Sequence, residues 1–276
     1  MAAPPAEELG LVRLLRGQAS EAAVEYRRLE GPEAYASSLG AAGLADLALY
    51  GGRLGEARKI LETAIASELE NGLNAFAIQK KIALAEALFS LGRPDDALKS
   101  VEGALAGTSN ESVQFACAMI LVRAGRESRA RELAESLAVL PSPEPQAYAR
   151  LIRGEIDLAQ GRYPEAIREI HEAQAQVDTW IGHFALGRAY LEAGQFTEAY
   201  SEFESCWKRR GETASIFLDD LPTLRYLPPV HYYLGRAQEG LKIPAAAESY
   251  KRYLEIKILA EGDPLVEDAK RRLGAL

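Results

Sequence analysis

The chain has 276 residues, with 40 acidic against 32 basic side chains and a net charge of −8. No run of Lys and Arg would follow a phosphate backbone, so nucleic acid is not an expected partner. The N-terminal stretch MAAPPAEELGLVRLL lacks the continuous apolar core of a signal peptide, and no segment approaches the ~20 apolar residues of a membrane span. We therefore expect a cytoplasmic protein without a membrane partner.

A ladder of small and apolar residues recurs along the chain. In GRYPEAIREIHEA, Gly161 is followed by Ala166, Ile170 and Ala173. Apolar residues three and four apart form one face of a helix, and the glycine suits the left-handed conformation that ends the preceding helix. Another small residue stands seven positions before each such glycine, so each copy predicts a pair of packed helices. The six turn glycines are Gly17, Gly52, Gly92, Gly125, Gly161 and Gly194.

The period of this ladder indicates a repeat family. The residues five after each turn glycine are spaced by 35, 40, 33, 36 and 33, close to the 34-residue period of tetratricopeptide repeats. The segment LGRAYLEAGQFTEAYSEF (186–203) resembles such a repeat, with matches at Leu186, Gly187, Tyr190, Gly194, Ala199 and Phe203. This resemblance implies an all-α, right-handed superhelical solenoid of about seven helical hairpins with a C-terminal capping helix.

The predicted array covers residues 1–276 as a single domain. A seventh hairpin, in VHYYLGRAQEGLKIPAAAESYKRYLEIK, has an inter-helix turn that looks one residue short. We place the repeats at about 6–31, 35–68, 75–106, 109–139, 144–176, 178–208 and 228–259, with an insertion at 209–227 and the capping helix at 263–274.

The insertion contains the stretch DDLPTLRYL. Prolines break the helical pattern here, yet Leu221, Leu224 and Tyr226 are too apolar for a solvated linker. We expect an ordered spacer that packs either on the last repeats or across the mouth of the groove. Asp219 and Asp220 are expected to cap a turn, since adjacent carboxylates alone rarely act as acid and base.

The C-terminal part carries a more particular resemblance. DLPTLRYLPPVHYYLGRAQEG and the helices after it resemble the repeat region of bacterial signalling proteins in which a eukaryotic-like serine/threonine kinase, or a related regulatory domain, precedes such repeats. The chain has no glycine-rich phosphate loop, HRD or DFG motif. The resemblance implies a sensing or docking module, with a kinase or other signalling domain as a partner.

No pattern supports catalysis, a cofactor or a metal. HExxH, paired cysteines and GxGxxG are all missing, and Cys117 and Cys206 lie in apolar helical patterns typical of buried free thiols. A pair of His183 and Glu155 from neighbouring first helices is the one catalytic alternative. Because no nucleophile accompanies it, a packed or solvent-facing histidine is preferred. We predict no enzyme.

In tetratricopeptide arrays the first helices form the concave surface, which places one set of residues in a peptide-binding groove. Aromatic and Met side chains there suit an apolar or amphipathic segment, although the same positions also pack between first helices. Glu86 and Glu155 favour a basic ligand, with Arg188 and Arg123 fixing its direction. The predicted groove consists of Ile82, Glu86, Phe89, Phe115, Met119, Val122, Tyr148, Leu151, Glu155, Ile181, Phe184 and Arg188.

Together these patterns predict a protein- or peptide-binding scaffold. We interpret it as an adaptor or docking module in bacterial signalling that binds an extended or helical segment in the groove. The alternatives are a self-associating structural repeat domain and, less favoured, an unrecognised helical enzyme. No pattern identifies the partner or the oligomeric state.

Overall fold

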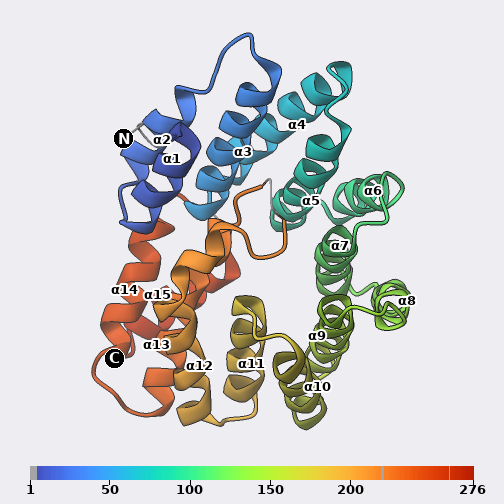
Figure 1. Cartoon of the computed structure of the whole chain (residues 1–276). Coiled ribbons are helices and arrows are strands. Elements are labelled where there is room, and N and C mark those ends of the chain that lie inside the picture. The colour runs from blue at the N-terminus through green and yellow to red at the C-terminus, as the bar shows by residue number, and fades with distance from the viewer. Residues whose placement is uncertain (1–4, 219–220, 261) are drawn as a thin grey trace. The chain divides into compact units, whose positions relative to one another are not determined.

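Helices are the only regular secondary structure in residues 5–218, 221–260 and 262–276, which are the residues that this computed structural model describes (Figure 1). The predicted all-α class is confirmed. Two 3₁₀ turns, η1 (Arg210–Ala214) and η2 (Leu224–Tyr226), lie between α12 and α13. The α-helices are α1 (Ala6–Leu15), α2 (Ala19–Arg27), α3 (Ala34–Tyr50), α4 (Leu54–Glu70), α5 (Asn74–Ser90), α6 (Pro94–Leu105), α7 (Glu111–Arg123), α8 (Glu127–Ala138), α9 (Pro143–Ala159), α10 (Tyr163–Gln176), α11 (Trp180–Glu192), α12 (Phe196–Lys208), α13 (Pro228–Gly240), α14 (Ala246–Ile256) and α15 (Pro264–Leu273).

The helices fall into two compact units. Unit 1 comprises Met1–Thr108, Gly211–Tyr226 and Ile258–Glu261, and unit 2 comprises Ser109–Arg210, Leu227–Lys257 and Gly262–Leu276. In both units consecutive helices pack in pairs, α1 with α2 through α13 with α14, and α15 packs on α14. The first helices of neighbouring pairs also touch: α1, α3 and α5 in unit 1, and α7, α9, α11 and α13 in unit 2.

Small residues let the two helices of a pair approach closely. At Gly187 in α11, an added Cβ would lie 2.7 Å from the ring of Phe203 in α12, and at Gly235 in α13 it would lie 2.7 Å from the ring of Tyr250 in α14. Phe203 and Tyr250 are fully buried. A side chain at either glycine would therefore overpack the hairpin, which explains the small residue seven positions before each turn.

The turns between paired helices follow one pattern. All six predicted turn glycines have φ between 69° and 79°, the left-handed conformation that Gly adopts without strain. At Gly194 the amide donates to Leu191 O and the next amide to Tyr190 O, which satisfies carbonyls at the end of α11. The conformation that the glycine ladder predicted is confirmed.

The prediction that the seventh turn is one residue short was wrong: five residues separate α13 from α14, against three between α11 and α12. Lys242 has φ 58° and takes the place of the turn glycine. Its amide donates to Glu239 O and the Ile243 amide to Gln238 O, as in the other turns. The sequence concealed this turn because a residue with a Cβ occupies a position that usually needs Gly.

The insertion is ordered where it is described. The Thr223 hydroxyl donates to Thr213 O at 2.9 Å and accepts from the Ile216 amide at 2.9 Å, which ties Thr223 to the first part of the insertion. Leu224 is fully buried, and η2 packs on α3 of unit 1. The prediction that Asp219 and Asp220 cap a turn lies outside the described residues.

Within the described part of the chain, no helix combines the length and the apolar character that crossing a membrane requires.

The seventh turn leads to a stability prediction. Lys242→Gly is expected to raise the free energy of unfolding by about 1 kcal/mol, because a left-handed conformation is strained for residues with a Cβ. Gly194→Ala should lower it by about the same amount, since nothing lies within 4 Å of the added Cβ and only the backbone conformation changes. Urea unfolding followed by circular dichroism measures both, and a less stable Lys242→Gly variant would contradict the assignment.

Candidate functional site

The predicted groove residues lie on the first helices, mostly ten, six and three positions before a turn residue. We call this set of positions the first-helix face. In unit 2 it is joined by stacked aromatic rings: Phe115 of α7 stacks on Tyr148 of α9 with ring centroids 4.4 Å apart. Phe184 of α11 stacks on Trp180 at 5.4 Å and meets Tyr233 of α13 edge-on at 5.5 Å. The Phe115–Tyr148 and Phe184–Tyr233 contacts join neighbouring first helices through rigid side chains.

Burial divides the predicted groove residues into two groups. Phe89, Met119 and Arg188 are half-buried, so they offer surface to another molecule. The other predicted residues form the packed floor: Ile82, Glu86, Phe115, Val122, Tyr148, Leu151, Glu155, Ile181 and Phe184 are all buried.

A carboxylate and a guanidinium link α9 to α11 on the first-helix face of unit 2. Arg188 Nη1 donates to both carboxylate oxygens of Glu155, at 2.9 and 3.1 Å. Burial alone would lower the pKa of the Arg188 guanidinium, but Glu155 and Tyr233 outweigh it and the pKa is raised. The Arg188 side chain is 29% exposed and that of Glu155 is 8%. The charge of Glu155 is therefore compensated from within unit 2, and Arg123 lies exposed on α7.

In unit 1 the predicted groove residue Glu86 also meets an arginine, one that no sequence pattern pointed to. Arg225 of η2 donates from Nε to Glu86 Oε2 at 2.5 Å and from Nη1 to Asp46 Oδ1 at 3.0 Å. Burial raises the pKa of the Asp46 carboxyl to about 6, although Arg225 opposes this shift. Asp46 was missed, yet it stands six positions before Gly52, the same offset as Glu86 before Gly92 and Glu155 before Gly161.

A second polar cluster of unit 1 lies between α3, α4 and α5. Lys80 Nζ is 2.5 Å from Glu68 Oε1 and donates to Ser38 Oγ at 2.9 Å, while the Ser38 hydroxyl donates to Glu68 at 2.5 Å. Lys80 and Glu68 are 1% and 3% exposed. Ser38 and Glu68 also line a pocket of about 420 Å³ between α3 and α4. The sequence predicted none of this, because neither charge stands out within its helix.

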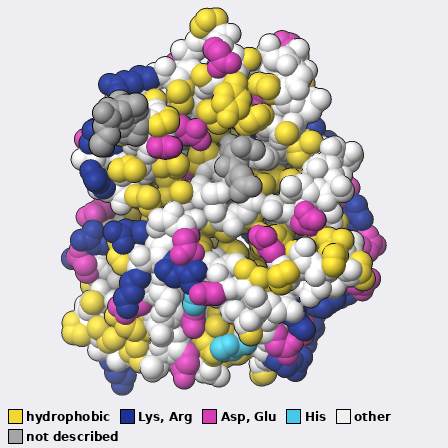
Figure 2. All heavy atoms as spheres, in the orientation of Figure 1, with side chains coloured by type: hydrophobic (Ala, Val, Ile, Leu, Met, Phe, Trp, Pro, Cys, Tyr) yellow, Lys and Arg dark blue, Asp and Glu magenta, His cyan; other side chains and the backbone are white. Residues whose placement is uncertain are grey.

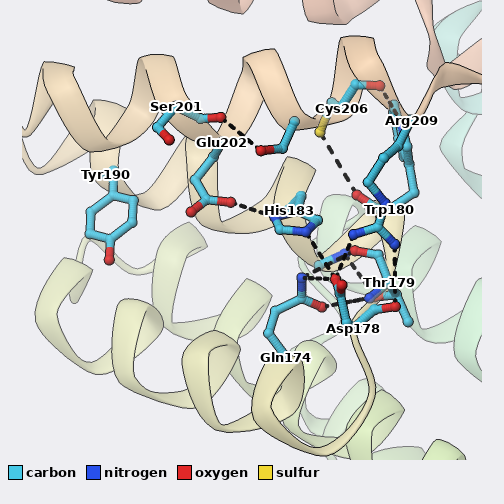
Figure 3. A network of polar contacts seen from close by, with 12 residues as sticks. Gln174, Asp178, Thr179, Trp180, His183, Tyr190, Ser201, Glu202, Cys206 and Arg209 are labelled. Atoms are coloured by element: carbon cyan, nitrogen blue, oxygen red, sulfur yellow. Dashed lines mark hydrogen bonds and ion pairs between the residues drawn. The ribbon is translucent and has the colours of Figure 1, made fainter.

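His183 lies between two carboxylates of unit 2, as Figure 3 shows. Nδ1 is 2.6 Å from Glu202 Oε2 on α12, and Nε2 is 2.9 Å from Asp178 Oδ1, which also accepts from Arg209 at 2.6 Å. The hydrogen bond to Glu202 raises the pKa of His183 most, against burial. His183 therefore pairs with these two residues, and the carboxylate of the alternative pair, Glu155, is held by Arg188.

Among the residues that the structure describes, no group of three His, Cys, Asp or Glu side chains is placed to hold a metal ion. Cys117 and Cys206 are buried free thiols, as predicted. On the face drawn in Figure 2, Lys and Arg side chains are interspersed with Asp and Glu. The polar side chains of the clusters described above thus form ion pairs that join helices.

A family model described as tetratricopeptide repeat matches this chain at residues 42–112, 82–145, 115–177 and 153–205. These overlapping matches run from residue 42 to residue 205, which is more than half of the 276 residues. A curated relative, Transcription activator GutR of Bacillus subtilis (strain 168), is 25% identical over 161 residues. The match covers 54% of this chain and 18% of GutR, so the chain spans less than a fifth of that relative.

Solved structures share the fold at low sequence identity. A tetratricopeptide repeat protein from Parabacteroides merdae has a TM-score of 0.55 and 17% identity, with 98% of this chain and 96% of that one covered. Human IFIT1, in a dimer with m7Gppp-AAAA, has a TM-score of 0.57 and 18% identity, with coverage of 93% and 58%. Cut9-Hcn1 of the APC/C has a TM-score of 0.51 and 17% identity, with coverage of 97% and 47%. At these identities the likeness shows the fold alone.

The buried cluster of unit 1 predicts a large effect of one substitution. Lys80→Met is expected to lower the free energy of unfolding by about 3–5 kcal/mol, because it leaves the Glu68 carboxylate buried without its cation. Lys80→Met/Glu68→Leu should recover most of this loss by removing both charges. Lys81→Met removes a hydrogen bond from the Lys81 side chain to Gly103 O, and it should change the free energy of unfolding by less than about 1 kcal/mol. Equal effects of Lys80→Met and Lys81→Met in urea unfolding would contradict the prediction.

The His183 cluster predicts a pH-dependent stability. Because the folded state raises the pKa of His183 above 6.5, its contribution is complete below pH 6.5 and is lost as the pH rises through the folded pKa. His183→Gln should therefore destabilise by on the order of 1 kcal/mol more at pH 6 than at pH 8.5. Urea titrations at both pH values test this. The difference should shrink in a Glu202→Gln background, and an unchanged difference there would exclude Glu202 as its source.

Proposed function

Because the chain belongs to the tetratricopeptide repeat family, we propose that it is a protein-interaction scaffold, an adaptor or docking module in bacterial signalling. It holds an extended or helical protein segment on the first-helix faces of its repeats. Tetratricopeptide repeats generally serve as interaction scaffolds, and the helix pairs packed within each unit supply a surface for such a role.

The observation that carries the proposal is the Glu155–Arg188 pair on the first-helix face of unit 2. The carboxylate is nearly buried and holds the guanidinium, whose side chain remains 29% exposed. A guanidinium that is already oriented loses little side-chain entropy when it binds, which favours affinity. Half-buried Met119 supplies adaptable apolar surface on α7.

This arrangement changes the ligand chemistry that the sequence alone favoured. Arg188 neutralises the charge of Glu155 and is the more exposed of the two side chains. A partner therefore contacts the Arg188 guanidinium first. An extended or helical segment with apolar side chains and a carboxylate or backbone carbonyl for Arg188 therefore fits better than a basic one. The buried rings of Phe115, Tyr148 and Phe184 give unit 2 a firm floor beside this contact.

The bacterial signalling role draws support from a relative. GutR is by name a transcription activator of Bacillus subtilis, and part of it is similar to this chain. A kinase or another signalling domain as a partner, and a cytoplasmic location, belong to the same proposal. IFIT1 was solved with an RNA ligand, but the net charge of −8 here favours a protein over RNA.

A comparative pull-down from bacterial lysate tests the proposal. The test variant Glu155→Gln/Arg188→Gln removes both charges together, so that no buried charge is left unpaired. Arg150→Ala is the matched control, since Arg150 pairs with Glu169 and Glu172 and its side chain is 31% exposed. Wild type and Arg150→Ala should retain the same partner, and the double variant should bind it at least about tenfold more weakly in calorimetry.

Circular dichroism must first show that the double variant keeps its helix content. Equal partner affinity for wild type, the control and the double variant would exclude the first-helix face of unit 2 as the binding surface. A concentration-dependent dimer in sedimentation, with no retained partner, would instead favour the self-associating alternative.

A further inference from the structure

Segment 211–226 places an arginine into unit 1. The Arg225 side chain is 4% exposed and lies between Asp46 of α3 and Glu86 of α5, which are 2% and 10% exposed. Besides its two ion pairs, Arg225 donates from Nη1 to Pro222 O at 2.7 Å, and its backbone amide donates to Asp46 Oδ1 at 3.3 Å. Side chain and backbone of one residue are thus both recognised.

The residue after the arginine is recognised as well. The Tyr226 hydroxyl donates to Glu86 Oε1, and the Phe217 ring meets the Tyr226 ring edge-on at 5.6 Å. Arg225 lies 5.0 Å above the same ring, a cation–π distance. Two carboxylates on adjacent first helices therefore bind an arginine followed by a tyrosine.

The repeat register explains why these carboxylates need a cation from elsewhere. Six positions before the turn residue, the three first helices of unit 1 carry Leu11, Asp46 and Glu86. None of these is basic, whereas in unit 2 the same offset supplies Arg188 to Glu155. The register of unit 1 thus places two neighbouring acids without a cation at the same offset, and Arg225 from outside the repeats pairs with both.

The contact made by the chain's own segment is incomplete. Asp46 Oδ2 and Arg225 Nη2 are buried and have no hydrogen-bond partner. Buried ion pairs add little net stability when their polar atoms are not all satisfied. Regular structure in the described part of the segment is limited to η1 and η2. A competing chain that satisfied these two atoms would bind more favourably.

We propose that Asp46 and Glu86 form an arginine-binding site on unit 1, filled by the chain's own segment 211–226, and that a partner segment carrying arginine followed by an aromatic residue binds there by replacing it. This rests on the proposed function in one respect, namely that the repeats bind protein segments. The arginine-binding site lies on unit 1 and takes a basic ligand, whereas the proposed function concerns unit 2 and a ligand that presents a carboxylate or carbonyl. The charge complementarity of the site selects this partner.

The test uses the full chain and a fluorescein-labelled peptide with the sequence of residues 211–227, GETASIFLDDLPTLRYL. Anisotropy titrations compare wild type with the opened variant Arg225→Ala/Tyr226→Phe. The opened variant should bind the peptide at least tenfold more tightly, because its own segment no longer holds the site. Adding Asp46→Asn and Glu86→Gln to the opened variant should abolish this gain, as should Arg225→Ala in the peptide.

The matched control is Arg236→Ala, which breaks a surface ion pair with Glu192 in unit 2. It should bind the peptide no better than wild type. Equal affinity of wild type and the opened variant, or a gain that survives Asp46→Asn and Glu86→Gln, would overturn the proposal. A wild-type dimer in sedimentation that the peptide dissociates would assign the site to a second copy and overturn the partner assignment.

If the opened variant does not fold, hydrogen exchange on the wild-type chain tests whether the peptide replaces the chain's own segment. Excess peptide should accelerate exchange of the Arg225 amide, which is bonded to Asp46 in the chain's own contact, and unchanged exchange would overturn the proposal. The variant Glu155→Gln/Arg188→Gln separates this site from the proposed function. It should bind the peptide as wild type does, even where it loses the partner of unit 2.

Discussion

The close approach of two helices within each hairpin is the constraint on which the rest of the structure depends. At Gly187 and Gly235 there is no room for a side chain beside the rings of Phe203 and Tyr250. The left-handed turn residue seven positions later reverses the chain at a fixed point, so every pair has the same offset between its helices. Because the offset is the same, corresponding positions on successive first helices lie in register.

This regular spacing of helices and turns is the part of the structure that the sequence predicts. Period, turn glycines and the buried ladder residues are local patterns, and they predict the helical class and six of the turns. The seventh turn was misjudged because Lys242 adopts a conformation that its residue type does not indicate. Tertiary packing of α13 on α14 outweighs a local preference of about 1–2 kcal/mol.

The polar partners of the candidate site were harder to predict for a different reason. Glu86 and Glu155 were found by their offset from a turn glycine, and Asp46 has the same offset from Gly52. Their cations follow no such rule: Arg188 lies 33 residues from Glu155, and Arg225 lies 139 residues from Glu86. One comes from the next repeat and the other from an irregular segment, so only the three-dimensional structure pairs them.

These pairs also bear on how the two units differ as binding surfaces. An acid on one first helix and an arginine on the next neutralise each other in unit 2, which leaves a fixed guanidinium partly exposed. In unit 1 two acids face the same arginine, and that arginine belongs to a segment outside the repeats. Burying these two carboxylates without a cation would be costly, and Arg225 supplies the compensating charge. The acids of unit 1 thus depend on Arg225, from outside the repeats, for their compensating charge, whereas the Glu155–Arg188 pair of unit 2 is formed by two repeats alone.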